Sequence, residues 1–116
     1  MSGFEVARAD NGEVSVLRLK GYLDAHTASD LEAALQRLVD EKRYRVIVNF
    51  KDLGYISSAG LGVFMGFIEE MRNGGGDIKL SNMSPKIFRV FDLLGFPALY
   101  EINDEESVAL ASFHKK

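Results

Sequence analysis

The segment from Tyr44 to Arg72 constrains the fold of this chain more than any other. Its first part, YRVIVNF from Tyr44 to Phe50, is almost entirely apolar, which is typical of a strand covered on both faces. Its last part, YISSAGLGVFMGFIEEMR from Tyr55 to Arg72, carries apolar residues at helical spacing, which are Leu61, Phe64, Met65, Ile68 and Met71. A buried strand that runs through a short loop into such a helix predicts an α/β fold.

The segments around it extend the same pattern. Phe4 to Ala9 and Val14 to Leu19 alternate apolar and polar residues on either side of Asn11-Gly12, which predicts a hairpin. After the hairpin we expect a helix with a capping box at Thr27 and Asp30, for which Asp24 is a competing cap. After the central segment we expect a strand from Asp77 to Ser81 and a helix that Ser84-Pro85 begins. The last elements are a strand from Leu99 to Ile102 and a helix capped by Asn103.

The order is therefore β-β-α-β-α-β-α-β-α without an internal linker or repeat. The chain of 116 residues is long enough for one ordinary core. We predict a single α/β domain over residues 1–116, with a mixed sheet that is parallel at its centre and has helices packed against it.

The composition of the chain argues against several classes of function. A net charge of −3 argues against non-specific nucleic-acid binding, which needs a basic face. The chain has no cysteine, no apolar signal core after Met1 and no run of membrane-spanning length. We therefore expect no membrane and no nucleic-acid partner, and the lack of thiols is compatible with a reducing cytoplasm.

Motifs of catalysis and cofactor binding are missing as well. His26 and His114 lie far apart and have no ligand partner at metal spacing. No GxSxG elbow occurs, no P-loop occurs, and Met65 stands where the dinucleotide fingerprint after Gly60 needs a glycine. We expect no catalytic residue, no metal and no cofactor.

Two serines, Ser57 and Ser58, stand where the helix of the central segment begins. A serine at this position caps the helix, and capping alone explains one of them. A second hydroxyl is then left over at a helix start, where orphan N–H groups and the helix dipole favour a phosphate. Regulation by phosphorylation and simple capping are both consistent with these residues.

The same helix contains Gly62 and Gly66, and each costs roughly 1 kcal/mol relative to alanine in a helix. With the core stripe as above, Val63 and Phe67 point away from the core on the side of these glycines. Close approach of another backbone would explain the glycines. Either a neighbouring helix of the same domain or a partner protein covers this face.

Three blocks of the sequence, in order and at matching spacing, resemble the STAS domains, and among them the single-domain bacterial anti-sigma factor antagonists. The blocks are GYLDAHTA from Gly21 to Ala28, VIVNFKDLGYISSAGLGV from Val46 to Val63, and SPKIFRVFDLLGF from Ser84 to Phe96. The resemblance covers essentially the whole chain and implies the STAS fold.

The resemblance also implies a mechanism of partner switching. In this family the antagonist binds an anti-sigma factor that is also a serine kinase, and phosphorylation of the antagonist by that kinase weakens the complex. A serine phosphatase reverses the modification, and the antagonist itself is a substrate rather than an enzyme.

Matched on Gly60-Leu61-Gly62, the family's acceptor serine falls on Ser58, with Ser57 as the alternative. In the best-studied type an aspartate precedes the acceptor and a serine or threonine follows it, whereas this chain has Ser57 and Ala59. Asp24 matches the family's aspartate beside the acceptor. The expected partner surface comprises Asp24, Ser57, Ala59, Gly60, Gly62, Val63, Gly66 and Phe67.

Two other functions fit the same fold. A constitutive STAS binding module, in a signalling scaffold or a transporter-associated complex, would use both serines as caps only. A small nucleotide- or lipid-binding domain would be stabilised by its ligand. The exposed face of the serine helix could also serve a homodimer.

Overall fold

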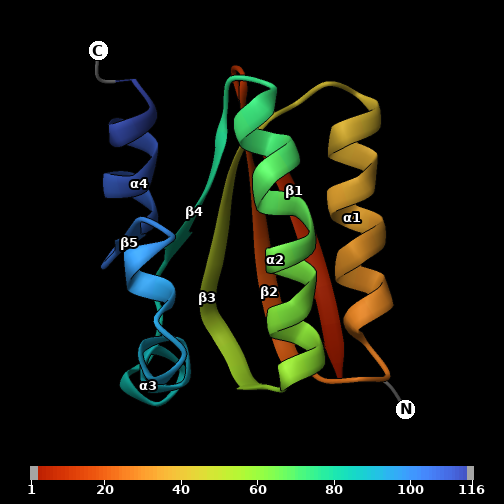
Figure 1. The fold of residues 1–116 in the computed structure, drawn as a ribbon, viewed down its shortest axis with the longest axis vertical. Helices are drawn as coiled ribbons and strands as arrows, with labels where there is room; N and C mark the ends of the chain where they lie inside the picture. Colours follow the sequence, from red (N-terminus) through yellow and green to blue (C-terminus); the bar gives the residue numbers. More distant parts are fainter. Residues whose placement is uncertain (1–2, 115–116) are drawn as a thin grey trace.

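The computed structural model describes residues 3–114 and arranges them in the predicted order (Figure 1). The strands are β1 (Phe4–Asn11), β2 (Val14–Leu23), β3 (Arg45–Ile56), β4 (Asp77–Ser81) and β5 (Ile102–Asn103). The helices are α1 (Ala28–Asp40), α2 (Ser58–Asn73), α3 (Pro85–Leu93) and α4 (Glu106–Phe113), with a short 3-10 helix, η1 (Phe96–Ala98), before β5.

Within the described residues the strands form one sheet in the order β1-β2-β3-β4-β5. β1 pairs antiparallel with β2, and each later pair is parallel, which confirms a mixed sheet with a parallel centre. The hairpin between β1 and β2 closes through Gly12, whose φ of +61° suits a glycine. The parallel strands all end at the same edge of the sheet, and this edge carries the site described below.

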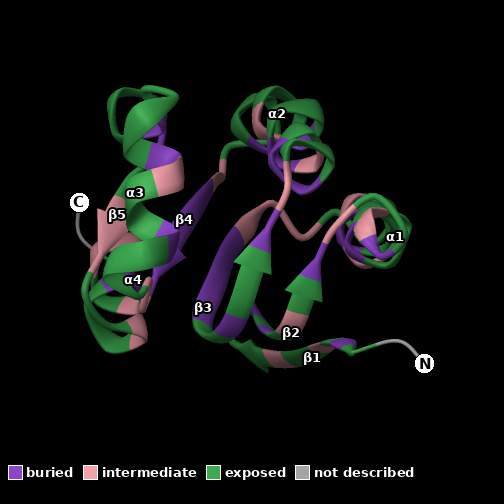
Figure 2. Ribbon diagram, turned by 90° about the horizontal axis from the view of Figure 1, so that it is seen from below, coloured by how far each residue is buried: buried purple, intermediate pink, exposed green. Residues whose placement is uncertain are grey.

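The two faces of the sheet have separate cores. Val46 and Val48 of β3 pack with the apolar residues of α1, α2 and α3, whereas Ile47 between them packs with Ala109 of α4. Successive residues of a strand point to opposite faces, so α4 lies on the face opposite to the other helices. Figure 2 shows α1 and α2 together on one face of the sheet, with their buried residues turned toward it.

Helix α2 is rotated slightly from the predicted phase. Phe67 is buried, with 7% of its surface exposed, while Met65 is 51% exposed. The prediction that Phe67 points away from the core, with Met65 toward it, is therefore wrong. Phe67 lies three residues after Phe64 and four before Met71, so it shares their face, and the larger aromatic side chain takes the buried position.

The predicted strand from Leu99 to Ile102 is shorter and later than expected. Phe96 begins η1, and the ring of the buried Tyr100 stacks on it with the two ring centroids 5.2 Å apart. This packing delays the strand until Ile102. Asn103 does not cap α4, because the helix begins at Glu106 and its N-cap is Glu105. The Asn103 Nδ2 donates to Glu101 Oε2 at 2.9 Å.

Polar contacts fasten α4 to its face of the sheet at both ends. The Glu106 carboxylate accepts hydrogen bonds from the guanidinium of Arg18 at 2.8 and 3.0 Å and from Asn49 Nδ2 at 2.9 Å. Near the other end, the ammonium of the buried Lys79 donates to Ser112 Oγ at 2.6 Å. Between these ends, α4 packs on Val14, Val16 and Ile47 through Ala109, so apolar and polar contacts together position the helix.

Candidate functional site

The start of α2 uses the two serines differently. Ser57 is the N-cap: its backbone is extended, and its Oγ accepts a hydrogen bond from the Gly60 N–H with an N···O distance of 3.4 Å. Ser58 is the first helical residue and is exposed. Its hydroxyl makes no hydrogen bond to any residue from 3 to 114, so capping accounts for Ser57 alone.

The Asp24 loop lies beside this serine turn. The Ser57 N–H donates to the Leu23 carbonyl at 2.9 Å, which joins the end of β2 to the start of α2. The Asp24 Oδ1 accepts from the N–H groups of His26 at 2.9 Å and Thr27 at 3.2 Å. These hydrogen bonds fix the shape of the loop and join it to the serine turn.

Thr27 contributes to the loop rather than to a capping box. Its hydroxyl donates to the Tyr22 carbonyl at 2.9 Å and accepts from the Asp24 N–H at 2.9 Å, and it makes no cap hydrogen bond to α1. The predicted capping box of Thr27 and Asp30 is therefore wrong. Asp24 holds the first turn of the helix, because its carboxylate binds the Thr27 N–H.

The electrostatics of the α2 start favour an anion. Its first turn, Ser58 to Gly60, contains no acidic side chain, and the N–H groups of a first turn have no partners within the helix. Since Ser58 is exposed at this end, an enzyme can reach its hydroxyl from solvent.

Gly60 belongs to the interior rather than to the surface. A Cβ added to it would lie 2.7 Å from Leu23 Cγ and 3.2 Å from Ile56 Cγ1. The lack of a side chain therefore allows α2 to pack directly on the ends of β2 and β3. This makes Gly60 a packing residue among those predicted for the partner surface.

Gly62 and Gly66 are different. Both are exposed, and apart from their chain neighbours and the adjoining backbone of α2 itself, no heavy atom of the described chain lies within 4 Å of a Cβ built on either. The reading that a neighbouring helix of the same domain covers them is therefore wrong. Met65, which stands beside Gly66, adds an exposed apolar side chain, and Val63 is half-buried. Together these exposed, uncharged residues form what is here called the α2 surface, which comprises Ser58, Ala59, Gly62, Met65 and Gly66.

The sequence analysis missed an aromatic pair at the same edge of the sheet. Tyr22 and Tyr55 are register partners near the ends of β2 and β3, their ring centroids are 6.3 Å apart, and they are 62% and 47% exposed. The sequence carries no clear signal for the pair, because the predicted strands ended at Leu19 and Phe50, whereas β2 and β3 continue past both tyrosines.

Metal and membrane features are absent from the described part of the chain. No group of three His, Asp or Glu residues lies where it could hold a metal ion within residues 3–114. In the same range, the helices lack the combination of length and apolar character that crossing a membrane requires.

The fold and the serine turn define the class of the protein. The sequence model of the STAS domain matches residues 5–109. The chain belongs to the STAS domain family.

Its relatives within that family are regulators of sigma factors. A candidate anti-sigma factor antagonist of Bordetella bronchiseptica, BtrV, is 33% identical over 95 residues, which cover 82% of each chain. The anti-sigma-B factor antagonist of Bacillus subtilis is 32% identical over 87 residues, 75% of this chain and 79% of its own.

One antagonist has been solved in both modification states. The unphosphorylated form of SpoIIAA is 25% identical, with a TM-score of 0.76 over 97% of this chain and 99% of its own. The phosphorylated form of SpoIIAA from Bacillus is 26% identical, with a TM-score of 0.73 over 95% of this chain and 98% of its own.

Proposed function

We propose that this chain is an anti-sigma factor antagonist that is switched by phosphorylation of Ser58. In its unmodified form it binds an anti-sigma factor with serine kinase activity through the α2 surface and the Asp24 loop. The kinase then phosphorylates Ser58 and the complex weakens, until a serine phosphatase restores the hydroxyl. The protein is a binding regulator and a substrate rather than an enzyme, and it acts in the bacterial cytoplasm.

One observation carries the choice of Ser58. Its hydroxyl is exposed and unused at the first residue of α2, while Ser57 supplies the cap. A phosphate on Ser58 would not remove a hydrogen bond that holds the fold. Ser57 is half-buried and its Oγ already accepts the Gly60 N–H, so a phosphate on Ser57 would have to fit into an occupied turn.

The effect of the phosphate follows from its charge and size. It adds about 1.5 to 2 negative charges, which the N-terminus of the helix that bears it tolerates. A partner packed against the α2 surface meets that charge directly, with the cost of desolvating it. Gly62 and Gly66 support such close packing, because no side chain keeps a partner backbone at a distance.

Relatives supply the second line of support. The matched proteins are named as anti-sigma factor antagonists, and SpoIIAA exists in phosphorylated and unphosphorylated forms. In the best-studied type an aspartate precedes the acceptor serine, whereas this chain has Ser57 at that position. The kinase that recognises this chain must therefore accept a serine there.

Phosphosite mapping by mass spectrometry tests the proposal on protein isolated from its own cells, in growth and in stress. We expect phosphate on Ser58 at a level that changes with condition. Phosphate on Ser57 would assign the switch to the other serine. If neither serine is modified under any condition, the protein is a constitutive STAS binding module and both hydroxyls serve only the fold.

A further inference from the structure

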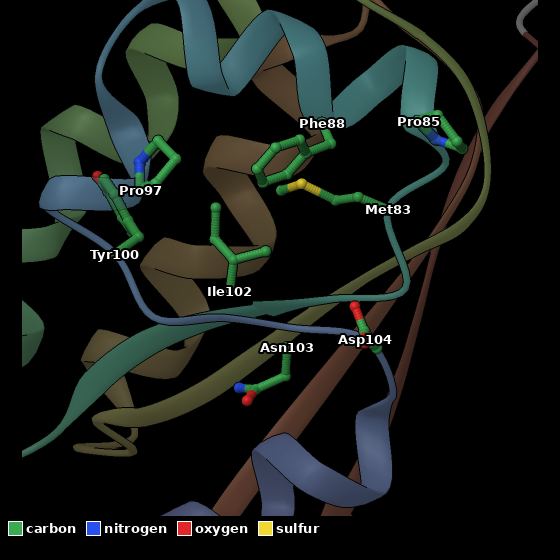
Figure 3. Close-up of a pocket in the computed structure, with 8 residues that line it drawn as sticks. All are labelled: Met83, Pro85, Phe88, Pro97, Tyr100, Ile102, Asn103 and Asp104. Atoms are coloured by element: carbon green, nitrogen blue, oxygen red, sulfur yellow. The ribbon is translucent and has the colours of Figure 1, made fainter.

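A cavity of about 550 Å³ lies between the start of α3, η1 and β5 (Figure 3). Met83 and Phe88 form one wall, Pro97 and Tyr100 another, and Ile102 of β5 lies between them. The cavity reaches the surface, since Phe88 is 38% exposed. It shares no residue with the serine turn or the Asp24 loop.

The topology explains why a cavity forms here. After β4 the chain continues into α3, whose Phe91 packs in the core of one face, and after β5 it continues into α4 on the opposite face. Where the connections from two adjacent parallel strands diverge in this way, a crevice opens outside their carboxyl ends, and ligands of open α/β sheets bind in such crevices. Met83 and Asp104 lie on these two diverging connections.

The polar groups around the cavity include a carboxylate and the buried hydroxyl of Tyr100, which has no hydrogen-bond partner within the described chain. Asp104 is exposed and is the one charged residue among the described lining residues. Asn82, which directly precedes Met83, has a φ of +59°, and its buried Oδ1 has no hydrogen-bond partner within the described chain. Buried polar atoms are rarely left unpaired, so the unsatisfied hydroxyl of the lining residue Tyr100 indicates a hydrogen-bond partner that is not part of the chain.

From these observations we propose that the cavity binds a small cationic aromatic molecule. Its flat ring lies against Phe88, Met83 and Ile102, and its ammonium group faces the carboxylate of Asp104. A volume of about 550 Å³ is within the ordinary range of small-molecule sites, which are mostly apolar with a few polar groups that fix orientation. The acidic rim selects for positive charge, because the lining offers an anion no compensating cation.

Tryptamine is a suitable first probe, since it joins a two-ring aromatic body to an ammonium. We expect ¹⁵N–¹H spectra of the full chain, titrated to about 10 mM, to show saturable shifts centred on Met83, Phe88, Ile102 and Asp104. Indole-3-propionate, with a similar ring and a carboxylate, should bind at least about threefold more weakly. Absence of saturable shifts for tryptamine, or shifts centred elsewhere, would overturn the proposal.

Variants that remove one charge distinguish the proposed recognition by Asp104 from non-specific binding of the probe. Asp104→Asn should weaken tryptamine binding about threefold to fivefold, while Glu105→Gln, a neighbouring exposed carboxylate outside the cavity lining, should leave it unchanged. Equal affinity of wild type and Asp104→Asn, or equal affinity for the two probes, would mean that the charged rim does not select the ligand and would refute the proposal.

Discussion

At the scale of single residues, the two adjacent serines illustrate how one side chain can serve the fold and leave its neighbour free. The Ser57 hydroxyl occupies the cap position, and the Gly60 N–H depends on it. The Ser58 hydroxyl is exposed and contacts no hydrogen-bonding group of the described chain. The two side chains therefore differ in what their removal should cost.

Alanine substitutions at the two serines should separate these roles. Because Ser57→Ala removes a cap, we expect it to lower the free energy of unfolding by about 1 kcal/mol. Ser58→Ala should change it by less than about 0.5 kcal/mol, as for other exposed positions. Urea denaturation measures both values, and a larger loss for Ser58→Ala would show that its hydroxyl also supports the fold.

The glycines of α2 allow a second test at this scale. Gly60→Ala places a methyl group against Leu23 Cγ and should destabilise the protein by about 1 to 3 kcal/mol. Gly62→Ala and Gly66→Ala meet no atom within 4 Å beyond the adjoining backbone of α2, and should stabilise the protein by about 0.4 to 1 kcal/mol, because alanine favours the helix.

Binding of the same glycine variants then reports on the partner surface. If Gly62 and Gly66 lie under a partner backbone, their alanine variants should bind the anti-sigma factor more weakly while folding more stably. Thermal denaturation and a binding titration on the same samples give both quantities. Unchanged binding by both variants would place the partner elsewhere.

At the scale of secondary-structure elements, α4 combines a small apolar contact with an ion pair at its first residue. Hydrogen bonds from Arg18 hold the pKa of the Glu106 carboxyl below its usual 4.5, despite partial burial, and Asn49 adds a further hydrogen bond. A carboxyl whose pKa is lower in the folded state stabilises the fold above pH 4.5, and this contribution is lost as the pH falls through the folded-state pKa.

Acid should therefore loosen α4 before other helices. We expect Glu106→Gln to flatten part of the fall in melting temperature between about pH 5 and pH 3, whereas Glu105→Gln should leave that fall intact. The effect on stability should be about 0.5 kcal/mol or less, since Arg18 is 51% exposed and solvent screens the pair. Identical pH profiles for wild type and Glu106→Gln would contradict this role.

Long strands and helices with a regular pattern of apolar residues could be predicted from the sequence, whereas elements of two or three residues could not. The run from Arg45 to Phe50 and the hairpin spacing were sufficient for the sheet and its parallel centre. β5, with two residues, carries too little pattern, and its position depends on the stacking of Tyr100 on Phe96. The phase of α2 was ambiguous because Met65 and Phe67 both fit a helical stripe.

The site could be predicted only in part for a similar reason. Ser57 and Ser58 are adjacent in sequence, so a helix start with two hydroxyls was visible. The cavity at α3 is lined by residues from separate segments, such as Met83, Pro97 and Ile102, and no local pattern joins them. Only the folded chain shows that the connections after β4 and β5 diverge.

At the scale of the whole molecule, the proposed phosphorylation site and the cavity both lie at the edge of the sheet where the parallel strands end. β2 and β3 end at the Asp24 loop and the serine turn, and β4 leads to α3 and the cavity at the same end (Figure 1). The opposite ends of the strands carry ion pairs such as that of Arg8 with Glu41. The fold thus presents the α2 surface on a rigid frame, with Ser58 beside it.

The central claim is that charge at Ser58 switches partner binding. The most direct measurement is the affinity of the anti-sigma factor, captured with Ser58→Ala from the protein's own cells, for wild type, Ser58→Asp and Ser107→Asp. Ser107 is an exposed residue in the first turn of α4, so its variant carries the same charge away from the α2 surface. We predict that Ser58→Asp binds at least about tenfold more weakly with an unchanged fold, while Ser107→Asp binds like wild type. Equal affinity of Ser58→Asp and wild type would contradict the claim.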